Sequence, residues 1–127
     1  MKITIQNASL EDRDAIYRLV RSERRYLLYR SKKEITGMIR EFVVARDGGR
    51  IIGCAAFEDY SPKIGELRSL VILPEYRGKH IGKKLIRTLL KRRHKNQKVF
   101  IVTSKVSYFE RLGFRNCLNE KYVLFKR

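Results

Sequence analysis

One strand–turn–helix pattern most constrains the fold of this chain. The run ELRSLVIL (66–73) is rich in apolar residues and reads as a strand, and Pro74 ends it because proline has no N–H for a sheet ladder. A basic turn with two glycines, RGKHIG (77–82), follows. A helix is then predicted from about Ile81 to His94, with Ile81, Leu85, Ile86, Leu89 and Leu90 at helical spacing on one side. A strand that leads into a helix through a glycine turn indicates an α/β domain.

The other segments extend this pattern along the chain. Further strands are predicted at 2–6, 41–46, 50–58 and 98–103, with one or two more around a turn at 116–120. Residues 59–65 are expected to form a loop. Helices are predicted to start after Ser9 and Ser31, each with an acid three residues later, and to cover 81–94 and 107–112. The order β-α-α-β-β-β-α-β-α-β predicts a mixed sheet, and 127 residues fit one domain, 1–127.

The charge balance restricts the partners. The chain has 30 Lys and Arg against 13 Asp and Glu, a net charge of +17, which attracts anionic ligands. A phosphate-rich cofactor is one candidate. Nucleic acid is another, through KRRHK (91–95), but no nucleic-acid motif or interleaved aromatic residue accompanies that run. A cationic helix end stabilised by the helix dipole is the simpler explanation of the run.

Cellular location and thiol state follow from what the sequence contains. No run approaches the ~20 apolar residues of a membrane span, and the first residues lack the apolar block of a signal peptide, so a cytoplasmic protein is expected. Cys54 and Cys117 are expected to be reduced and mostly buried, with one disulfide as the alternative. No metal is expected.

The turn at 77–82 is suited to phosphate. The first N–H groups of the following helix have no internal partner and carry the positive end of its dipole. Gly78 and Gly82 let the backbone come close to a ligand. The surrounding cations are Arg77, Lys79, Lys83 and Lys84. On spacing alone, a plain glycine loop with solvated cations is an equally good interpretation.

The strand, the proline, the turn and the helix together resemble the acyl-CoA site of the GNAT superfamily of N-acetyltransferases. The family pattern is Gln or Arg, two residues, Gly, one residue, then Gly or Ala, and His80 stands at the place of its first glycine. The resemblance implies acetyl-CoA as acetyl donor, with its pyrophosphate on the N–H groups of about 78–83. The implied cofactor-binding residues are Leu70, Val71, Ile72, Arg77, Gly78, Lys79, His80, Ile81, Gly82 and Lys83.

The resemblance covers nearly the whole chain. Leu112-Gly113-Phe114 matches the Gly-Phe ending of the family's last helix, and segments 26–35, 42–58, 65–86 and 98–114 resemble the short, stand-alone form of N-acetylglutamate synthase. It implies a GNAT-like fold, with a central mixed sheet of about six to seven strands and about four flanking helices. It also implies acetylation of L-glutamate in arginine biosynthesis. The alternatives are another amine or protein acceptor, or a CoA-binding or RNA-associated regulator without catalysis. GNAT proteins often form homodimers, but no interface signal stands out.

Glu66 is the leading candidate for the base that deprotonates the acceptor amine, and the synthase-like family has a glutamate at the matching place. By the family pattern, Val71 would offer backbone groups to the thioester or the pantetheine of CoA. Many GNAT proteins have an acid tyrosine four residues before the glycine of the Gly-Phe pair, where this chain has Phe109. Ser104, Tyr108 or water are the substitutes, although CoA thiol is acidic enough to leave unaided.

A dicarboxylate acceptor needs two cationic contacts. The candidates are Arg30, Arg68 and Lys105. Glu66 and Arg68 share a strand parity and therefore a sheet face, which suits a base beside an anion anchor. An ion pair between them on a solvated face is an equally good interpretation.

Overall fold

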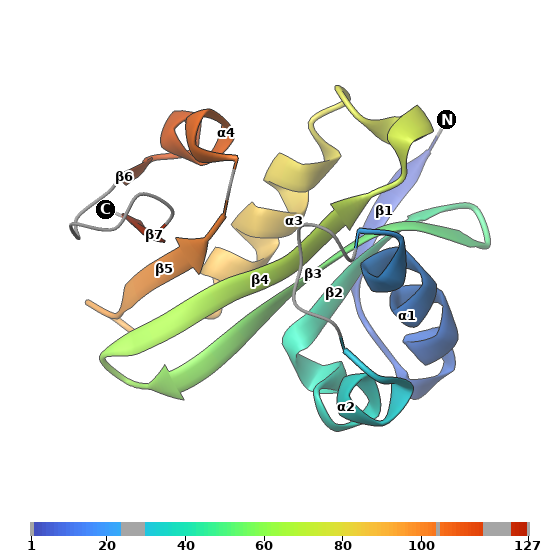
Figure 1. The fold of residues 1–127 in the computed structure, drawn as a ribbon, viewed down its shortest axis with the longest axis horizontal. Helices are drawn as coiled ribbons and strands as arrows, with labels where there is room; N and C mark the ends of the chain where they lie inside the picture. Colours follow the sequence, from blue (N-terminus) through green and yellow to red (C-terminus); the bar gives the residue numbers. More distant parts are fainter. Residues whose placement is uncertain (1, 24–29, 104, 116–122, 127) are drawn as a thin grey trace.

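The computed structural model describes residues 2–23, 30–103, 105–115 and 123–126, and Figure 1 shows its arrangement. The strands are β1 (Ile3–Asn7), β2 (Phe42–Asp47), β3 (Arg50–Ser61), β4 (Ile64–Ile72), β5 (Lys98–Val102), β6 (Phe114–Arg115) and β7 (Val123–Lys126). The helices are α1 (Arg13–Ser22), α2 (Lys32–Gly37), α3 (Ile81–Leu90) and α4 (Val106–Arg111). Three 3-10 turns join them: η1 (Leu10–Asp12), η2 (Ile39–Glu41) and η3 (Pro74–Tyr76).

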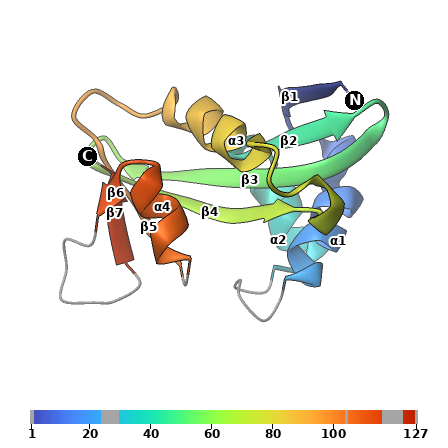
Figure 2. The same ribbon diagram turned by 90° about the horizontal axis from the view of Figure 1, so that it is seen from above.

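All seven strands form one mixed sheet in the order β1-β2-β3-β4-β5-β7-β6. Only β4 and β5 run parallel; every other neighbouring pair is antiparallel. In Figure 2, α3 covers one face of the central strands while α1 and α2 cover the other. One apolar cluster lies between the sheet and α3 with α4, and a second lies under α1 and α2. The predicted α/β architecture, with six to seven strands and about four helices, is confirmed.

Both predicted helix starts are capping boxes in the structure. At the second, Ser31 Oγ accepts the Glu34 N–H at 3.1 Å and Glu34 Oε1 accepts the Ser31 N–H at 3.1 Å. At the first, Asp12 Oδ2 accepts the Ser9 N–H at 2.8 Å, and the chain makes one 3-10 turn before α1 begins. These short-range signals set where α1 and α2 start.

The predicted loop at 59–65 is wrong. β3 runs on to Ser61 and β4 starts at Ile64, so a turn of only two residues joins them. The hairpin is held from a distant part of the chain, because the buried Gln97 side chain donates to Asp59 Oδ1 at 2.8 Å and to the Ser61 carbonyl at 2.7 Å. The correction places Tyr60 on a strand instead of in a loop.

The predicted helix over 81–94 is too long, because α3 ends at Leu90. Its apolar face, with Ile81, Leu85, Ile86 and Leu89, is buried against the sheet, and no apolar residue follows Leu90 in that pattern. No helix in the described part of the chain is long and apolar enough to cross a membrane.

β4 and β5 diverge, and β4 carries a bulge. The two strands pair only over Ile64–Glu66 and Lys98–Phe100, which leaves the rest of this β4 edge without a strand partner. On its other edge β4 pairs Arg68 with Ala56 and Val71 with Cys54, so two residues of β4 oppose one of β3. Within this bulge, Ser69 has a left-handed backbone with φ 58°.

The bulge reverses the side-chain alternation of β4. Before it, Leu67 packs in the cluster under α3, so Glu66 and Arg68 point to the α1/α2 side. After it, Val71 packs in the cluster under α1 and α2, and Leu70 points toward α3. One strand therefore presents Glu66, Arg68 and Val71 on the same face.

Candidate active site

A cleft of about 1040 Å³ opens where β4 and β5 diverge. It runs from Tyr60 and Glu66 at one end to the turn before α3 at the other, and α4 forms part of its wall. Arg30, Arg68 and Lys105 line the same cleft. Among the described candidates, only Lys79 does not line it, and Ser104 lies outside the described residues.

The end of the cleft at α3 is built mainly from backbone. Gly78 has φ 79° and His80, the N-cap of α3, has φ 62°. The histidine thus occupies a left-handed conformation that glycine adopts freely and that a residue with a Cβ adopts at a cost of about 1–2 kcal/mol. This conformation explains why a glycine is usual at this position. His80 adopts this left-handed conformation, and its side chain is exposed to solvent.

Gly82 is needed for close packing. A Cβ added there would overlap the Tyr108 hydroxyl, so the absent side chain lets the first turn of α3 approach α4. That first turn has no acidic residue, and Lys83 beside it lines the cleft. The free N–H groups of this turn and the cations around them form a site for a phosphate group.

Arg77 is exposed but is held by two contacts within the chain. Its Nη2 donates to Glu23 Oε1 at 2.5 Å, and its Nε donates to the Ile72 carbonyl at 3.0 Å. Both Arg77 and Glu23 line the cleft, so this ion pair ties the end of α1 to the turn that precedes α3.

The other end of the cleft is built from side chains. The Tyr60 hydroxyl donates to Glu66 Oε1 at 2.5 Å, and Arg68 Nη1 lies 3.4 Å from the same oxygen and 3.2 Å from the Tyr60 hydroxyl. Arg68 also forms a short ion pair with Glu58, which faces Glu66 across the β3–β4 ladder. Burial and the hydrogen bonds to Glu66 and Glu58 raise the pKa of Tyr60, which keeps its phenol protonated.

Two further charged residues, Glu41 and Arg30, lie close to this cluster. Burial and the nearby Glu58 raise the pKa of Glu41, against the attraction of Arg68 and Arg30. Buried Arg30 Nε, Arg68 Nε and Glu41 Oε1 have no hydrogen-bond partner among the described residues. Arg30 lies 3.8 Å from Glu34, whereas Lys105 is exposed at the cleft.

The position of the usual acid tyrosine is filled by a core residue. Phe109 is buried and packs edge-to-face against Tyr108 and Phe114. Tyr108 is only partly buried, and burial raises its pKa, so it stays protonated at neutral pH. Its hydroxyl lies against Gly82, at the α3 end of the cleft.

Cys54 supports the bulge and is not a nucleophile. Its thiol is fully buried, and burial raises its pKa to about 12. Cys54 Sγ lies 3.5 Å from the Ser69 carbonyl and also receives the Val71 N–H, so it bridges the two sides of the bulge. Cys117 lies outside the described residues.

Sequence reasoning missed Tyr60 and Glu58 because their partners, Glu66 and Arg68, lie on another strand. Asp59-Tyr60-Ser61 looked like the start of a loop, and the only signal for its true place was the alternation that continues from residues 50–58. The basic run 91–95 is also used differently from the prediction. Arg92 Nη1 donates to the Arg40 carbonyl at 3.0 Å, Arg93 donates to the Gln97 carbonyl, and His94 Nε2 lies 2.7 Å from Asp59 Oδ2.

The residues at the α3 end fit CoA. Between Glu75 and Glu110 the sequence has no Asp or Glu, so the turn and α3 present N–H groups and cations without local acidic competition. The open edge of β4 adds backbone without a strand partner along the cleft. An extended molecule that carries a pyrophosphate and amide groups matches both features.

Comparison with known proteins identifies the family. The Acetyltransferase (GNAT) domain family matches residues 38–116. An uncharacterised N-acetyltransferase of Chlorobaculum tepidum is 35% identical over 123 residues, 93% of this chain and 79% of that protein. The amino-acid acetyltransferase of Pasteurella multocida is 29% identical over 88% of this chain, but the chain spans only 27% of its length.

Solved structures agree with this assignment. A Mycobacterium tuberculosis protein in complex with CoA superposes with a TM-score of 0.85 at 27% identity, over 91% of this chain and 73% of that one. N-acetylglutamate synthase of Neisseria gonorrhoeae shares the fold, with a TM-score of 0.89 at 21% identity, over 100% of this chain and 35% of the synthase. The chain therefore belongs to the GNAT family and is an acetyl-CoA-dependent N-acetyltransferase.

Proposed function

We propose that the chain acetylates the α-amino group of an amino acid, with L-glutamate as the preferred acceptor, as in the first step of arginine biosynthesis. The observation that carries this proposal is the continuity of the cleft, which joins the phosphate-binding turn to Glu66, Arg30 and Lys105. The names of the Pasteurella acetyltransferase and of the Neisseria synthase, solved with coenzyme A and N-acetyl-glutamate, support an amino-acid acceptor.

Glu66 acts as the base in this proposal. Its carboxylate takes a proton from the acceptor ammonium, directly or through one water, so that the amine can attack. Tyr60 and Arg68 fix one carboxylate oxygen, which leaves the other to receive the proton. Because Arg68 already pairs with Glu58 and Glu66, its role is to position the base rather than to anchor the acceptor.

The open edge of β4 stabilises the developing negative charge. Acetyl-CoA supplies the thioester whose carbonyl carbon the amine attacks. The N–H groups of Val71 and Leu73 point toward β3, where they contact Cys54 and the Ile52 carbonyl. The role expected of the Val71 backbone therefore passes to Ile72: since backbone groups alternate along the strand after the bulge, the Ile72 N–H faces the cleft, where a fixed donor stabilises an oxyanion.

Departure of the thiolate needs no dedicated acid in this proposal. Phe109 cannot donate a proton, and the Tyr108 hydroxyl lies at Gly82, which is the donor end of the cleft. Water remains the source of the proton that the CoA thiolate eventually takes up. Ser104, outside the described residues, is the alternative.

Arg30 and Lys105 anchor the carboxylates of the acceptor. Arg30 has a buried Nε without a partner among the described residues, and its contact with Glu34 is a long 3.8 Å. Lys105 forms no ion pair with any described acid. Two cations from different ends of the chain would bind two carboxylates of one small acceptor.

The test follows CoA thiol release with acetyl-CoA and the twenty amino acids. The proposal expects release that depends on glutamate, and a KM for glutamate raised at least about 10-fold in Lys105→Gln and Arg30→Gln, as expected when a charged hydrogen bond of about 1.5–3 kcal/mol is lost. Lys63→Gln, at the hairpin turn outside the cleft, is the matched control. Release only with proteins or polyamines would reassign the acceptor. CoA binding without any release would instead favour a regulator that lacks catalysis.

A further inference from the structure

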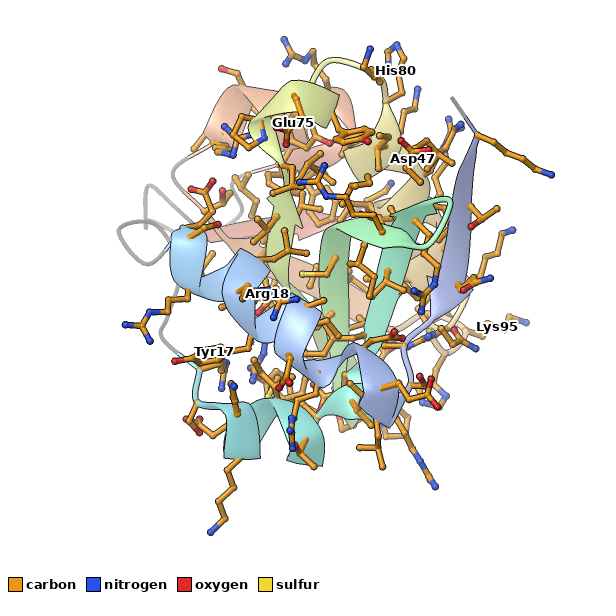
Figure 3. All side chains as sticks on the ribbon, turned by 90° about the vertical axis from the view of Figure 1, so that its right-hand side faces the viewer. Tyr17, Arg18, Asp47, Glu75, His80 and Lys95 are labelled. Atoms are coloured by element: carbon orange, nitrogen blue, oxygen red, sulfur yellow. The ribbon has the colours of Figure 1, made fainter. Side chains whose placement is uncertain are left out.

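The outer face of α3 carries cations that acetyl transfer does not use. From Tyr76 to Phe109 the sequence contains eleven Lys and Arg and no acidic residue. α3 buries its apolar side and leaves Lys84 and Arg87 exposed, with Lys91 at its C-cap and Lys95 in the turn beyond. We call these four residues the α3 basic stripe. Figure 3 labels Lys95 at one end of it and His80 just before the helix.

The stripe has no charge partner within the described protein. No acidic side chain of the described residues lies within ion-pair distance of any of its four members. The nearby Arg92, Arg93 and His94 differ, because they bind backbone carbonyls or Asp59. Since none of the stripe residues lines the cleft, they are also separate from the donor site.

This arrangement suits only one end of the helix, where Arg87 in the last turn and Lys91 at the C-cap complement the helix dipole. Like charges three and four residues apart destabilise a helix by about 0.2–0.5 kcal/mol per pair, and Lys84 in the first turn opposes the helix dipole. The acids of α1 and α2, such as Asp14 and Glu34, lie across the sheet from α3 and cannot compensate (Figure 2). An external anion would compensate the stripe.

We propose that the α3 basic stripe binds the phosphate backbone of a nucleic acid without reading its bases. Its three helical members rise along about 10 Å of the helix axis, which suits a ligand with repeated negative charges. A membrane-bound helix or a specific protein interface would need apolar or aromatic residues among the cations. The exposed large hydrophobic residues of the described chain are Leu10, Tyr60 and Val102, and none lies on α3.

The number of cations in the stripe sets the expected salt dependence of nucleic-acid binding. Four phosphate contacts give a slope of about −3.6 for log affinity against log salt on a duplex, so affinity falls on the order of 10²-fold between 50 and 200 mM salt. The absence of aromatic residues from the stripe predicts the same affinity for unrelated sequences, because base stacking and edge readout have no side chains to use.

The test measures fluorescence anisotropy of a labelled 20-base-pair duplex, in two unrelated sequences, against salt and without acetyl-CoA. Lys84→Gln/Arg87→Gln/Lys91→Gln should flatten the slope by roughly 2.7, since three contacts are lost. The matched control is Arg18→Gln/Arg21→Gln/Lys33→Gln, which removes the same charge from α1 and α2 on the other face of the sheet.

The outcomes are separable from those for acetyl transfer. Binding lost in the α3 variant and kept in the control supports the stripe, with thiol release by both variants within about two-fold of the parent chain. Equal loss in both variants, or a slope near zero, would overturn it. Tighter binding to vesicles that contain anionic phosphatidylserine than to the duplex would also overturn it, and would assign the stripe to a membrane surface.

Discussion

The two ends of the cleft are made in different ways. The donor end is a short continuous segment whose main-chain conformation matters: a left-handed N-cap at His80, a glycine at 82 and free N–H groups in the first turn of α3. The acceptor end is a set of side chains from separate strands, in which Tyr60, Glu66 and Arg68 hold one another. A main-chain site tolerates most changes of side chain, whereas a side-chain site tolerates few.

Of the changes that separate the two ends of the cleft, Glu66→Gln is expected to lower kcat the most. The amide keeps the shape and can still bond Tyr60, but it cannot take a proton, so kcat should fall by roughly 10²–10⁴-fold. CoA affinity, measured by calorimetry, should not change, because the donor end is untouched. Glu75→Gln in η3 serves as the control. A parent-like rate for Glu66→Gln would move the base elsewhere.

Gly82→Ala tests the donor end where a side chain does matter. The added methyl would overlap the Tyr108 hydroxyl and force that side chain to shift at the cleft, and overpacking of about 1–3 kcal/mol corresponds to roughly 5- to 150-fold weaker CoA binding. The double variant Gly82→Ala/Tyr108→Phe removes the overlapping oxygen and should recover most of the affinity. Failure to recover would show that the phosphate itself needs the glycine.

Tyr60→Phe tests the hydrogen bond that positions the base, Glu66. The hydrogen bond to Glu66 is lost while the ring that stacks on Phe100 remains, so kcat should fall roughly 10-fold, as for a charged hydrogen bond of about 1.5 kcal/mol. KM for acetyl-CoA should stay the same. Tyr17→Phe on α1 is the matched control, and an equal effect there would attribute the loss to stability alone.

Cys54→Val has the smallest expected effect. Valine fills the same buried space without the thiol that bridges Ser69 and Val71, so kcat should drop roughly 2- to 10-fold, the equivalent of about 0.5–1.5 kcal/mol. Cys54→Ser keeps a donor and an acceptor there and should retain more activity than valine. If the two variants have equal rates, the bulge does not depend on this contact.

Local signals predicted much of the fold, and a contiguous motif predicted the donor end. Three of these signals depend only on residues that are close in the sequence: the capping boxes, the Asp47-Gly48-Gly49 turn and the apolar periodicity. They can therefore be interpreted without knowing the tertiary structure. The loop expected at 59–65 failed because Gln97, far along the chain, completes that hairpin. Tyr60 and Glu58 were missed for the same reason, since Tyr60 reaches Glu66 only once β3 is known to be long.

The bulge at Ser69 and Leu70 has a consequence for how the gene can vary. The extra residue in the bulge changes which side chains of β4 face α1 and α2. Glu66 and Val71 therefore lie on the same face of the sheet, although they are five residues apart. A single-codon deletion there would restore strict alternation and turn the side chain of either Glu66 or Val71 to the opposite face of the sheet. Substitutions can accumulate along this strand, but an insertion or deletion between residues 66 and 72 would move Glu66 relative to the part of the cleft that binds acetyl-CoA. Alignments of functional relatives should therefore be free of gaps there.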